Sequence, residues 1–182
     1  MTRDRTIIPK LPGNAPHPAA LDEPVLLRDC EVTFGRHSGP GGQHRNKVET
    51  AVQVVHTPTG VTASAGERRA QIENRRKAIR RLRENLSREV RRDVDPRRFR
   101  PSELWTQRRQ GKQMSINPKH RDFPALLAEA LDLIVARGYD VAGAAGMLGI
   151  TMSQLAKLVR HDKRAFAWVN EGRKSRGLAA LK

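Results

Sequence analysis

Hydrophobic periodicity constrains the fold of this chain more than any other feature of its sequence. Apolar and polar residues alternate at residues 30–34 and 61–65, and residues 50–56 between them are also interpreted as a strand. A period of two is typical of strands with one buried face. The turn signal Thr57-Pro-Thr-Gly60 separates the second and third segments, because Pro58 presets φ and Gly60 can adopt a positive φ. We therefore expect a small antiparallel sheet.

A long basic helix is predicted directly after the third strand. Ser64 and Glu67 have the spacing of a capping box, which satisfies two backbone amides at a helix start. Apolar residues then recur along one helical stripe, which we expect to lie across the sheet: Ile72, Ile79, Leu82, Leu86 and Val90. The predicted fold class is α+β, a small antiparallel sheet packed by a long basic helix and followed by a small all-helical C-terminal region.

Composition divides the chain into five segments. Five prolines and few apolar groups in residues 1–24 predict a disordered, proline-rich arm. It either contacts RNA through its basic residues or is a passive tail. Residues 25–92 form the predicted sheet-and-helix domain, and residues 93–121 are interpreted as a linker. Apolar stripes predict a helical C-terminal domain over residues 122–172, and residues 173–182 form a basic tail.

The helical C-terminal region has the spacing of a helix-turn-helix. Ala145, Gly149 and Leu155 stand at the positions of the small residue, the turn glycine and the packed apolar residue. In that arrangement the second helix presents three polar side chains for docking to nucleic acid or the ribosome: Gln154, Lys157 and Arg160. The alternative is a small helical bundle in which Gly149 only interrupts a helix.

The charge of the chain points to a polyanionic partner. Its 182 residues carry 35 Lys and Arg against 19 Asp and Glu, a net charge of +16, and cations gain affinity for nucleic acid by displacing counterions from phosphates. No apolar run is long enough to span a membrane. The lone Cys30 excludes an intrachain disulfide and fits a reducing compartment. With no apolar signal core at the amino end, we expect a cytoplasmic protein that contacts nucleic acid and not a membrane.

The predicted long helix carries most of the candidate RNA contacts. Its basic residues are too dense for a face that interleaves opposite charges for solvation, so we expect contacts with phosphates that position RNA without reading its sequence. A merely solvated face is the alternative. The candidate RNA-binding residues are Arg68, Arg69, Arg75, Arg76, Arg80 and Arg81.

Between the first two predicted strands lies a glycine-rich stretch, Ser38-Gly-Pro-Gly-Gly-Gln43. Adjacent glycines allow a positive φ and a close approach of the backbone to another molecule. A Gly-Gly pair alone is also compatible with a flexible hairpin connection. The spacings of the phosphate-binding glycine motifs are absent. No Cys, His and carboxylate cluster has ligand spacing, so no metal or cofactor is expected, and His37 and His44 are interpreted as exposed or RNA-contacting.

The longer string decides between these interpretations. The run from Ser38-Gly-Pro-Gly-Gly-Gln-His-Arg-Asn-Lys to Val52, followed by His56-Thr-Pro-Thr-Gly-Val61, resembles the catalytic domain of class I peptide chain release factors. The resemblance extends from about residue 26 to residue 90. It implies that the loop enters the peptidyl transferase centre of the large ribosomal subunit and promotes hydrolysis of the ester between peptide and tRNA.

The resemblance also implies roles for the loop residues. The backbone amide of Gln43 would stabilise the oxyanion of the reacting ester, Gly41 and Gly42 would permit the required conformation, and the Gln43 side chain would position water. In this family the glutamine is often N-methylated, so we expect the same modification of Gln43 by a glutamine methyltransferase. Residues expected to support the loop or contact ribosomal RNA are Ser38, Gly39, Pro40, His44, Arg45, Asn46 and Lys47; Arg45 stands where the family commonly has a small or aliphatic residue.

Full-length release factors carry further domains, including one that reads stop codons, for which 182 residues leave no room. The sequence therefore predicts a short release-factor homologue, a monomer that frees peptides from stalled ribosomes independently of a stop codon. Its partners would be 23S-type ribosomal RNA of the large subunit and peptidyl-tRNA. The main alternative is a non-catalytic RNA- or ribosome-binding regulator that uses the helix-turn-helix-like tail. A purely structural ribosome component is a third, for which the loop would be superfluous.

Overall fold

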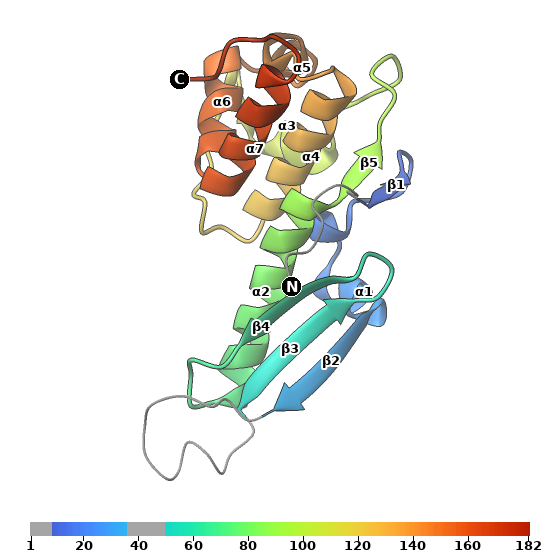
Figure 1. Ribbon diagram of the computed structural model, residues 1–182, viewed down its shortest axis with the longest axis vertical. Helices are drawn as coiled ribbons and strands as arrows, with labels where there is room; N and C mark the ends of the chain where they lie inside the picture. Colours follow the sequence, from blue (N-terminus) through green and yellow to red (C-terminus); the bar gives the residue numbers. More distant parts are fainter. Residues whose placement is uncertain (1–8, 36–49) are drawn as a thin grey trace.

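A computed structural model describes residues 9–35 and 50–182, which form an elongated molecule with a sheet at one end and helices at the other (Figure 1). In chain order the elements are β1 (Lys10–Pro12), the 3-10 turn η1 (Pro18–Ala20), α1 (Glu23–Arg28), β2 (Cys30–Gly35), β3 (Ala51–His56), β4 (Val61–Ala65), α2 (Gln71–Glu89), β5 (Arg91–Asp93), α3 (Glu103–Arg108), β6 (Arg109–Gln110), β7 (Gln113–Met114), α4 (Phe123–Ala136), α5 (Val141–Met147), α6 (Met152–Arg160) and α7 (Lys163–Lys174).

The three predicted strands form an antiparallel sheet in the order β2-β3-β4. The turn between β3 and β4 contains Gly60 at a φ of +67°, the positive value that the sequence pattern requires. Val52, Val54 and Ala63 are buried on one face of the sheet and share a core with α2. The predicted α+β fold class is confirmed.

Helix α2 buries the predicted stripe with one exception. Ile79, Leu82, Leu86 and Val90 are at most 2% exposed, whereas Ile72, in the first turn, is 54% exposed. The predicted capping box at the helix start is wrong. The N-cap residue is Ala70, which has no capping side chain, and the carboxylate of Glu67 pairs with Arg81 further along the helix.

The described part of the amino-terminal segment is packed, which differs from the expectation of a disordered arm. β1 pairs in parallel with β5. The buried His17 donates from Nε2 to the carbonyl oxygen of Val90 at 3.1 Å and accepts at Nδ1 from the amide of Ala19 at 3.1 Å. Because both ring nitrogens are satisfied by backbone groups, a proline-rich segment with few apolar side chains still packs against the end of α2.

The stretch interpreted as a linker, residues 93–121, also packs into the fold. It contains α3 and the β6–β7 hairpin, and its Trp105 is fully buried. The indole Nε1 donates to the carbonyl oxygen of Leu148 at 2.9 Å, and the ring joins the core of the helical region. Trp105 and the buried Met114 therefore anchor a stretch whose other residues are mostly polar.

Helices α4–α7 form the second core, and α5 and α6 are joined by a short turn as the helix-turn-helix spacing predicts. Gly149 occupies the turn with a φ of +71°, and Ala145 and Leu155 are buried on either side of it. Thr151 caps α6 by accepting from the amide of Gln154 at 3.2 Å. The predicted basic tail folds back on this unit through Leu181, which is 7% exposed.

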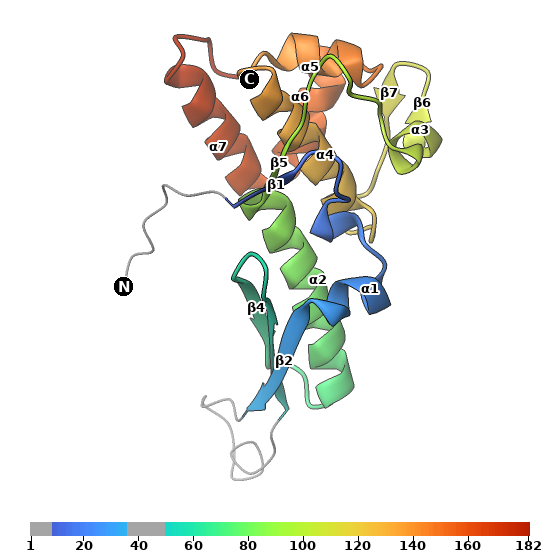
Figure 2. The ribbon, with the colours of Figure 1, turned by 90° about the vertical axis from the view of Figure 1, so that its right-hand side faces the viewer.

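Buried charges join the sheet end to the helical end. Asp132 of α4, which is fully buried, accepts from Arg91 Nη1 at 3.2 Å and from Arg92 Nε at 2.8 Å. Nearby, Arg88 of α2 pairs with Asp162 at 2.6 Å. Since removing one member of a buried ion pair is strongly destabilising, these contacts fix the helical unit to α2 and β5. Figure 2 shows α2 running from the sheet to the helical end of the molecule. Among the described residues, no helix is both long enough and apolar enough to cross a bilayer.

Candidate functional site

The predicted catalytic loop lies outside the described residues. This applies to Gly41, Gly42 and Gln43, to their predicted neighbours from Ser38 to Lys47, and to His37. The structure does describe the two strands that precede and follow this segment. β2 ends at Gly35 and β3 begins at Ala51, and these two residues are paired in register. This end of the sheet is the one farther from the helical unit (Figure 1).

A buried asparagine of α2 holds the residue just before β3. Asn74 is fully buried, and its Nδ2 donates to the carbonyl oxygens of Thr50 and Arg68, both at 2.8 Å. Its Oδ1 accepts from the amide of Arg68 at 2.9 Å. These three bonds satisfy both amide hydrogens and the carbonyl oxygen of the side chain. Asn74 therefore ties the carboxyl-terminal stem of the predicted loop to the segment that leads into α2.

Sequence reasoning missed Asn74, although one signal was present. Asn74, Ala78 and Leu82 are four residues apart and lie on the buried face of α2. A polar residue in register with an apolar stripe must find buried hydrogen-bond partners. The partners themselves could not be inferred, because Thr50 is 24 residues away in the chain.

Glu67 provides a second tie in the same region. Its carboxylate pairs with Arg81 and with Lys77, the latter at 3.3 Å, and accepts from the amide of Gly66 at 3.1 Å. Partial burial raises the pKa of this carboxyl, but the hydrogen bonds it accepts outweigh that effect and bring its pKa to about 2. Glu67 is therefore ionised at neutral pH and holds the connection between β4 and α2 against the helix.

The six predicted RNA-binding arginines fall into two groups. Arg75 pairs with Glu23 at 3.6 Å, Arg80 pairs with Glu84 at 3.1 Å, and Arg81 pairs with Glu67. The other three are exposed and have no ion-pair partner among the described residues: Arg68, Arg69 and Arg76. Carboxylates thus pair with half of the six predicted RNA-binding arginines.

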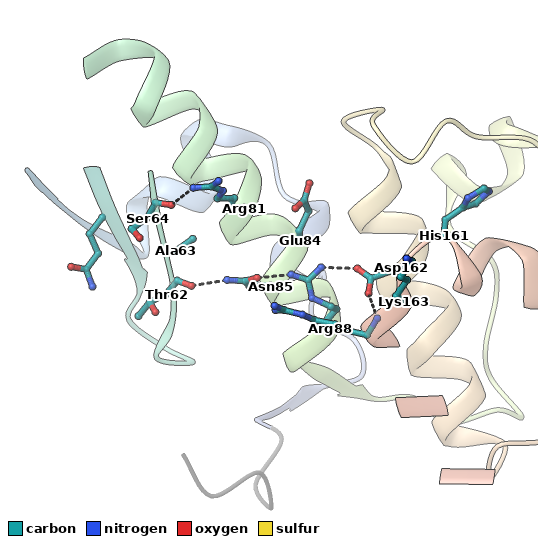
Figure 3. A pocket seen from close by; sticks show the side chains of 12 residues that line it. Thr62, Ala63, Ser64, Arg81, Glu84, Asn85, Arg88, His161, Asp162 and Lys163 are labelled. Carbon is teal, nitrogen blue, oxygen red and sulfur yellow. Dashed lines mark hydrogen bonds and ion pairs between the residues drawn. The ribbon is translucent and has the colours of Figure 1, made fainter. Parts of the chain in front are cut away.

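A groove of about 590 Å³ separates the sheet face of α2 from the turn between α6 and α7 (Figure 3). Arg81 and Arg88 line it from α2, and Lys163 lines it from the start of α7. Asp162 accepts from Arg88 and also caps α7 by accepting from the amide of Ala165 at 2.9 Å. Both α2 guanidinium groups of the groove are paired with carboxylates, Arg81 with Glu67 and Arg88 with Asp162, and the second pair joins α2 to the start of α7.

The predicted docking residues of the tail lie together on α6. Gln154 is half-buried, Lys157 is exposed, and Arg160 is exposed with its guanidinium 5.2 Å from the ring centroid of Phe166. Elsewhere, Cys30 is partly buried and donates its thiol to the carbonyl oxygen of Leu26 at 3.2 Å, and burial raises the pKa of that thiol. Within residues 9–35 and 50–182, no group of His, Cys, Asp and Glu is placed to hold a metal ion.

Comparison with known proteins places the matched region over the sheet, α2 and the segment that follows it. A family model described as "RF-1 domain" matches residues 23–122. The chain is 39% identical over 75 residues to the mitochondrial peptide chain release factor 1 of Bos taurus, covering 41% of this chain and 17% of that protein. It is 40% identical over 80 residues to the chloroplastic release factor PrfB1 of Arabidopsis thaliana, covering 44% and 16% respectively. It is 41% identical over 76 residues to peptide chain release factor 1 of Acidiphilium cryptum, covering 42% and 22%. The chain therefore spans about a fifth of the length of these relatives.

Proposed function

The chain belongs to the RF-1 domain family, the catalytic domain of class I peptide chain release factors, and on that premise we propose that it hydrolyses peptidyl-tRNA on the ribosome. The observation that carries the proposal is the string Gly41-Gly42-Gln43 within the matched region, between strands that pair at Gly35 and Ala51. The large ribosomal subunit, its RNA and peptidyl-tRNA are the proposed partners, in the cytoplasm, and no cofactor is invoked.

Ester hydrolysis needs a donor aimed at the oxygen that becomes negative in the transition state. We assign this role to the backbone N–H of Gln43, with Gly41 and Gly42 providing the backbone freedom it needs. The side chain of Gln43 positions the attacking water, an orientation effect. The amide nitrogen of that side chain is the proposed site of methylation. Water attacks the ester carbon, the ester C–O bond breaks, and a proton passes to the released 3′ oxygen of the tRNA.

The finer part of the proposal is release without a stop codon. Residues outside the matched region include the helical unit α4–α7, which buried ion pairs hold against α2. Its exposed cations, such as Lys157, suit phosphates, and phosphate contacts position a protein without reading sequence. This favours docking by RNA shape and charge over codon recognition.

The test uses ribosomes carrying labelled peptidyl-tRNA, stalled on a messenger that lacks a stop codon. We expect release by the wild-type protein with methylated Gln43, and a loss of roughly a hundredfold or more in Gly42→Ala, because a misaligned oxyanion donor forfeits about that much rate. Gly146→Ala is the matched control, since no atom lies within 4 Å of the added Cβ. Absence of release by the methylated wild type would refute the proposal, and dependence on a stop codon would refute its finer part.

A non-catalytic RNA-binding regulator is the second candidate, favoured by the exposed cations of α6. Comparison of Gly42→Ala with the double variant Arg76→Ala, Arg80→Ala separates the two candidates. Lost release with retained ribosome binding in the first variant supports hydrolysis. A wild-type protein that binds ribosomes without releasing peptide supports the regulator.

A further inference from the structure

The β6–β7 hairpin lies directly against the turn between α5 and α6. Arg109 Nη1 donates to the carbonyl oxygen of Gly149 at 3.4 Å and to that of Gly111, in the hairpin turn, at 2.8 Å. The amide of Thr151, the N-cap of α6, donates to the carbonyl oxygen of Lys112 at 3.2 Å. Residues 111–112 are thus joined to the start of α6 by backbone and side-chain contacts.

Buried groups on both sides hold the hairpin in place. Trp105 precedes it and bonds to Leu148 at the end of α5, and Met114 at its end is 6% exposed in the same core. Figure 2 shows α3, β6 and β7 together at the helical end of the molecule, away from the sheet. The hairpin is therefore a fixed neighbour of α6.

The surface formed by these two elements carries positive charge and no carboxylate. Residues 104–121 contain five Lys or Arg and no Asp or Glu. Residues 141–161 contain two Lys or Arg and again no Asp or Glu. Arg108 is engaged by Asp122 at 2.5 Å. Arg109, Lys112 and Lys157 are exposed, and no carboxylate of the described residues lies within ion-pair distance of them. On α2, in contrast, Arg76 is exposed and unpaired among the described residues, but carboxylates pair with most of the other cations: Arg75, Lys77, Arg80, Arg81 and Arg88.

We propose that the β6–β7 hairpin and the exposed face of α6 form one docking surface for the backbone of folded RNA; that this RNA is ribosomal rests on the proposed function. Lys112 and Lys157 supply the phosphate contacts at its two ends. The backbone of Lys112 bonds to Thr151, the N-cap of α6, and Lys157 lies six residues after Thr151, about 9 Å further along the helix axis at 1.5 Å per residue. The exposed amides of Gln110 and Gln113 can hydrogen-bond the 2′-hydroxyl groups, which distinguish RNA from DNA.

The experiment measures binding of the full chain to a fluorescent RNA hairpin as a function of salt concentration. The test variant is Lys112→Ala, Lys157→Ala. The control is Lys174→Ala, Lys182→Ala, which removes the same charge from two exposed lysines on other parts of the helical unit. Loss of two phosphate contacts lowers the slope of log affinity against log salt by about 1.8, at about 0.9 per contact. A fourfold rise in salt should then weaken RNA binding by the wild type about twelvefold more than binding by the test variant. The same rise should weaken binding by the wild type and by the control variant to the same extent.

Equal effects of the two double variants would overturn the proposal, because binding would then follow net charge alone. An unchanged slope in the test variant would also overturn it, as would a DNA duplex of the same sequence bound at least as tightly as the RNA. Thermal melting of each variant checks that the fold is intact. Peptide release plays no part in this measurement, so inactivity on stalled ribosomes would refute the proposed function and leave this docking surface standing.

Discussion

Replacing Asn74 tests whether the stem of the predicted loop controls release. Asn74→Ala removes three hydrogen bonds of 2.8, 2.8 and 2.9 Å and leaves the carbonyl oxygen of Thr50 without that donor. At about 1 kcal/mol for each bond, the free energy of unfolding should fall by about 3 kcal/mol. Because Arg68 is exposed, water can hydrogen-bond its freed backbone amide and carbonyl groups, which limits the loss of stability to about this value. The unfolding measurement is urea denaturation.

Asn85→Ala is the matched control, because Asn85 lies on the same helix and ties it to the sheet away from the loop. Its Nδ2 donates to Thr62 at 2.7 Å and its Oδ1 accepts from Arg88 at 2.5 Å. We expect a comparable loss of about 2 kcal/mol in stability. Single-turnover release, measured below the unfolding midpoint of both variants, should fall at least tenfold in Asn74→Ala and stay unchanged in Asn85→Ala, since small displacements of a reacting group cost large factors in rate. Equal release rates of the two folded variants would refute the reasoning.

Three further predictions concern stability. Burial lowers the pKa of His17 to about 4, so between pH 6.5 and pH 4 the unfolded chain binds more protons than the folded chain. The contribution of His17 to the free energy of unfolding is therefore complete above pH 6.5 and falls as the pH drops, by about 2 kcal/mol between pH 7 and pH 5 in urea denaturation. His17→Gln should flatten this pH dependence. Gly149→Ala places a Cβ 3.2 Å from Arg109 Nη1 at a φ of +71° and should cost about 1–2 kcal/mol in the same measurement, whereas Gly146→Ala should be neutral or stabilising. Asp132→Asn leaves the buried guanidinium of Arg91 without its countercharge and should lower the free energy of unfolding by about 3–5 kcal/mol. A loss below about 1 kcal/mol would contradict the role of this ion pair in holding the helical unit to the rest of the fold.

Local periodicity was enough to predict the sheet and the main helix. The alternation at residues 30–34 and 61–65 and the stripe from Ile72 to Val90 each depend on neighbours a few residues apart. The structure has a strand at each of the two alternating segments and buries the stripe apart from Ile72. The glycine turn at Gly149 was predictable for the same reason, because its positive φ is a local requirement.

The polar contacts that complete the fold were not predictable in this way. His17 bonds to Val90, 73 residues away, and Arg92 bonds to Asp132, 40 residues away. Whether a polar side chain is buried depends on such distant partners, which composition does not encode. The proline-rich segment and the stretch of residues 93–121 were therefore interpreted as an arm and a linker. The roles of Gly41, Gly42 and Gln43 came from their resemblance to a family, and they remain predictions.

The distribution of partners among the cations connects the two ends of the molecule. A net charge of +16 does not say which Lys and Arg are available. The fold brings Glu67 and Asp162 to cations of α2, whereas no carboxylate of the described residues pairs with Lys112 or Lys157. Helix α2, about 28 Å long at 19 residues, and the buried pair of Arg91 and Asp132 set the distance between the proposed docking surface and the end of β2. RNA bound at the proposed docking surface therefore also sets where the end of β2 lies. Breaking the ion pair of Arg91 and Asp132 should then impair peptide release more than it impairs RNA binding.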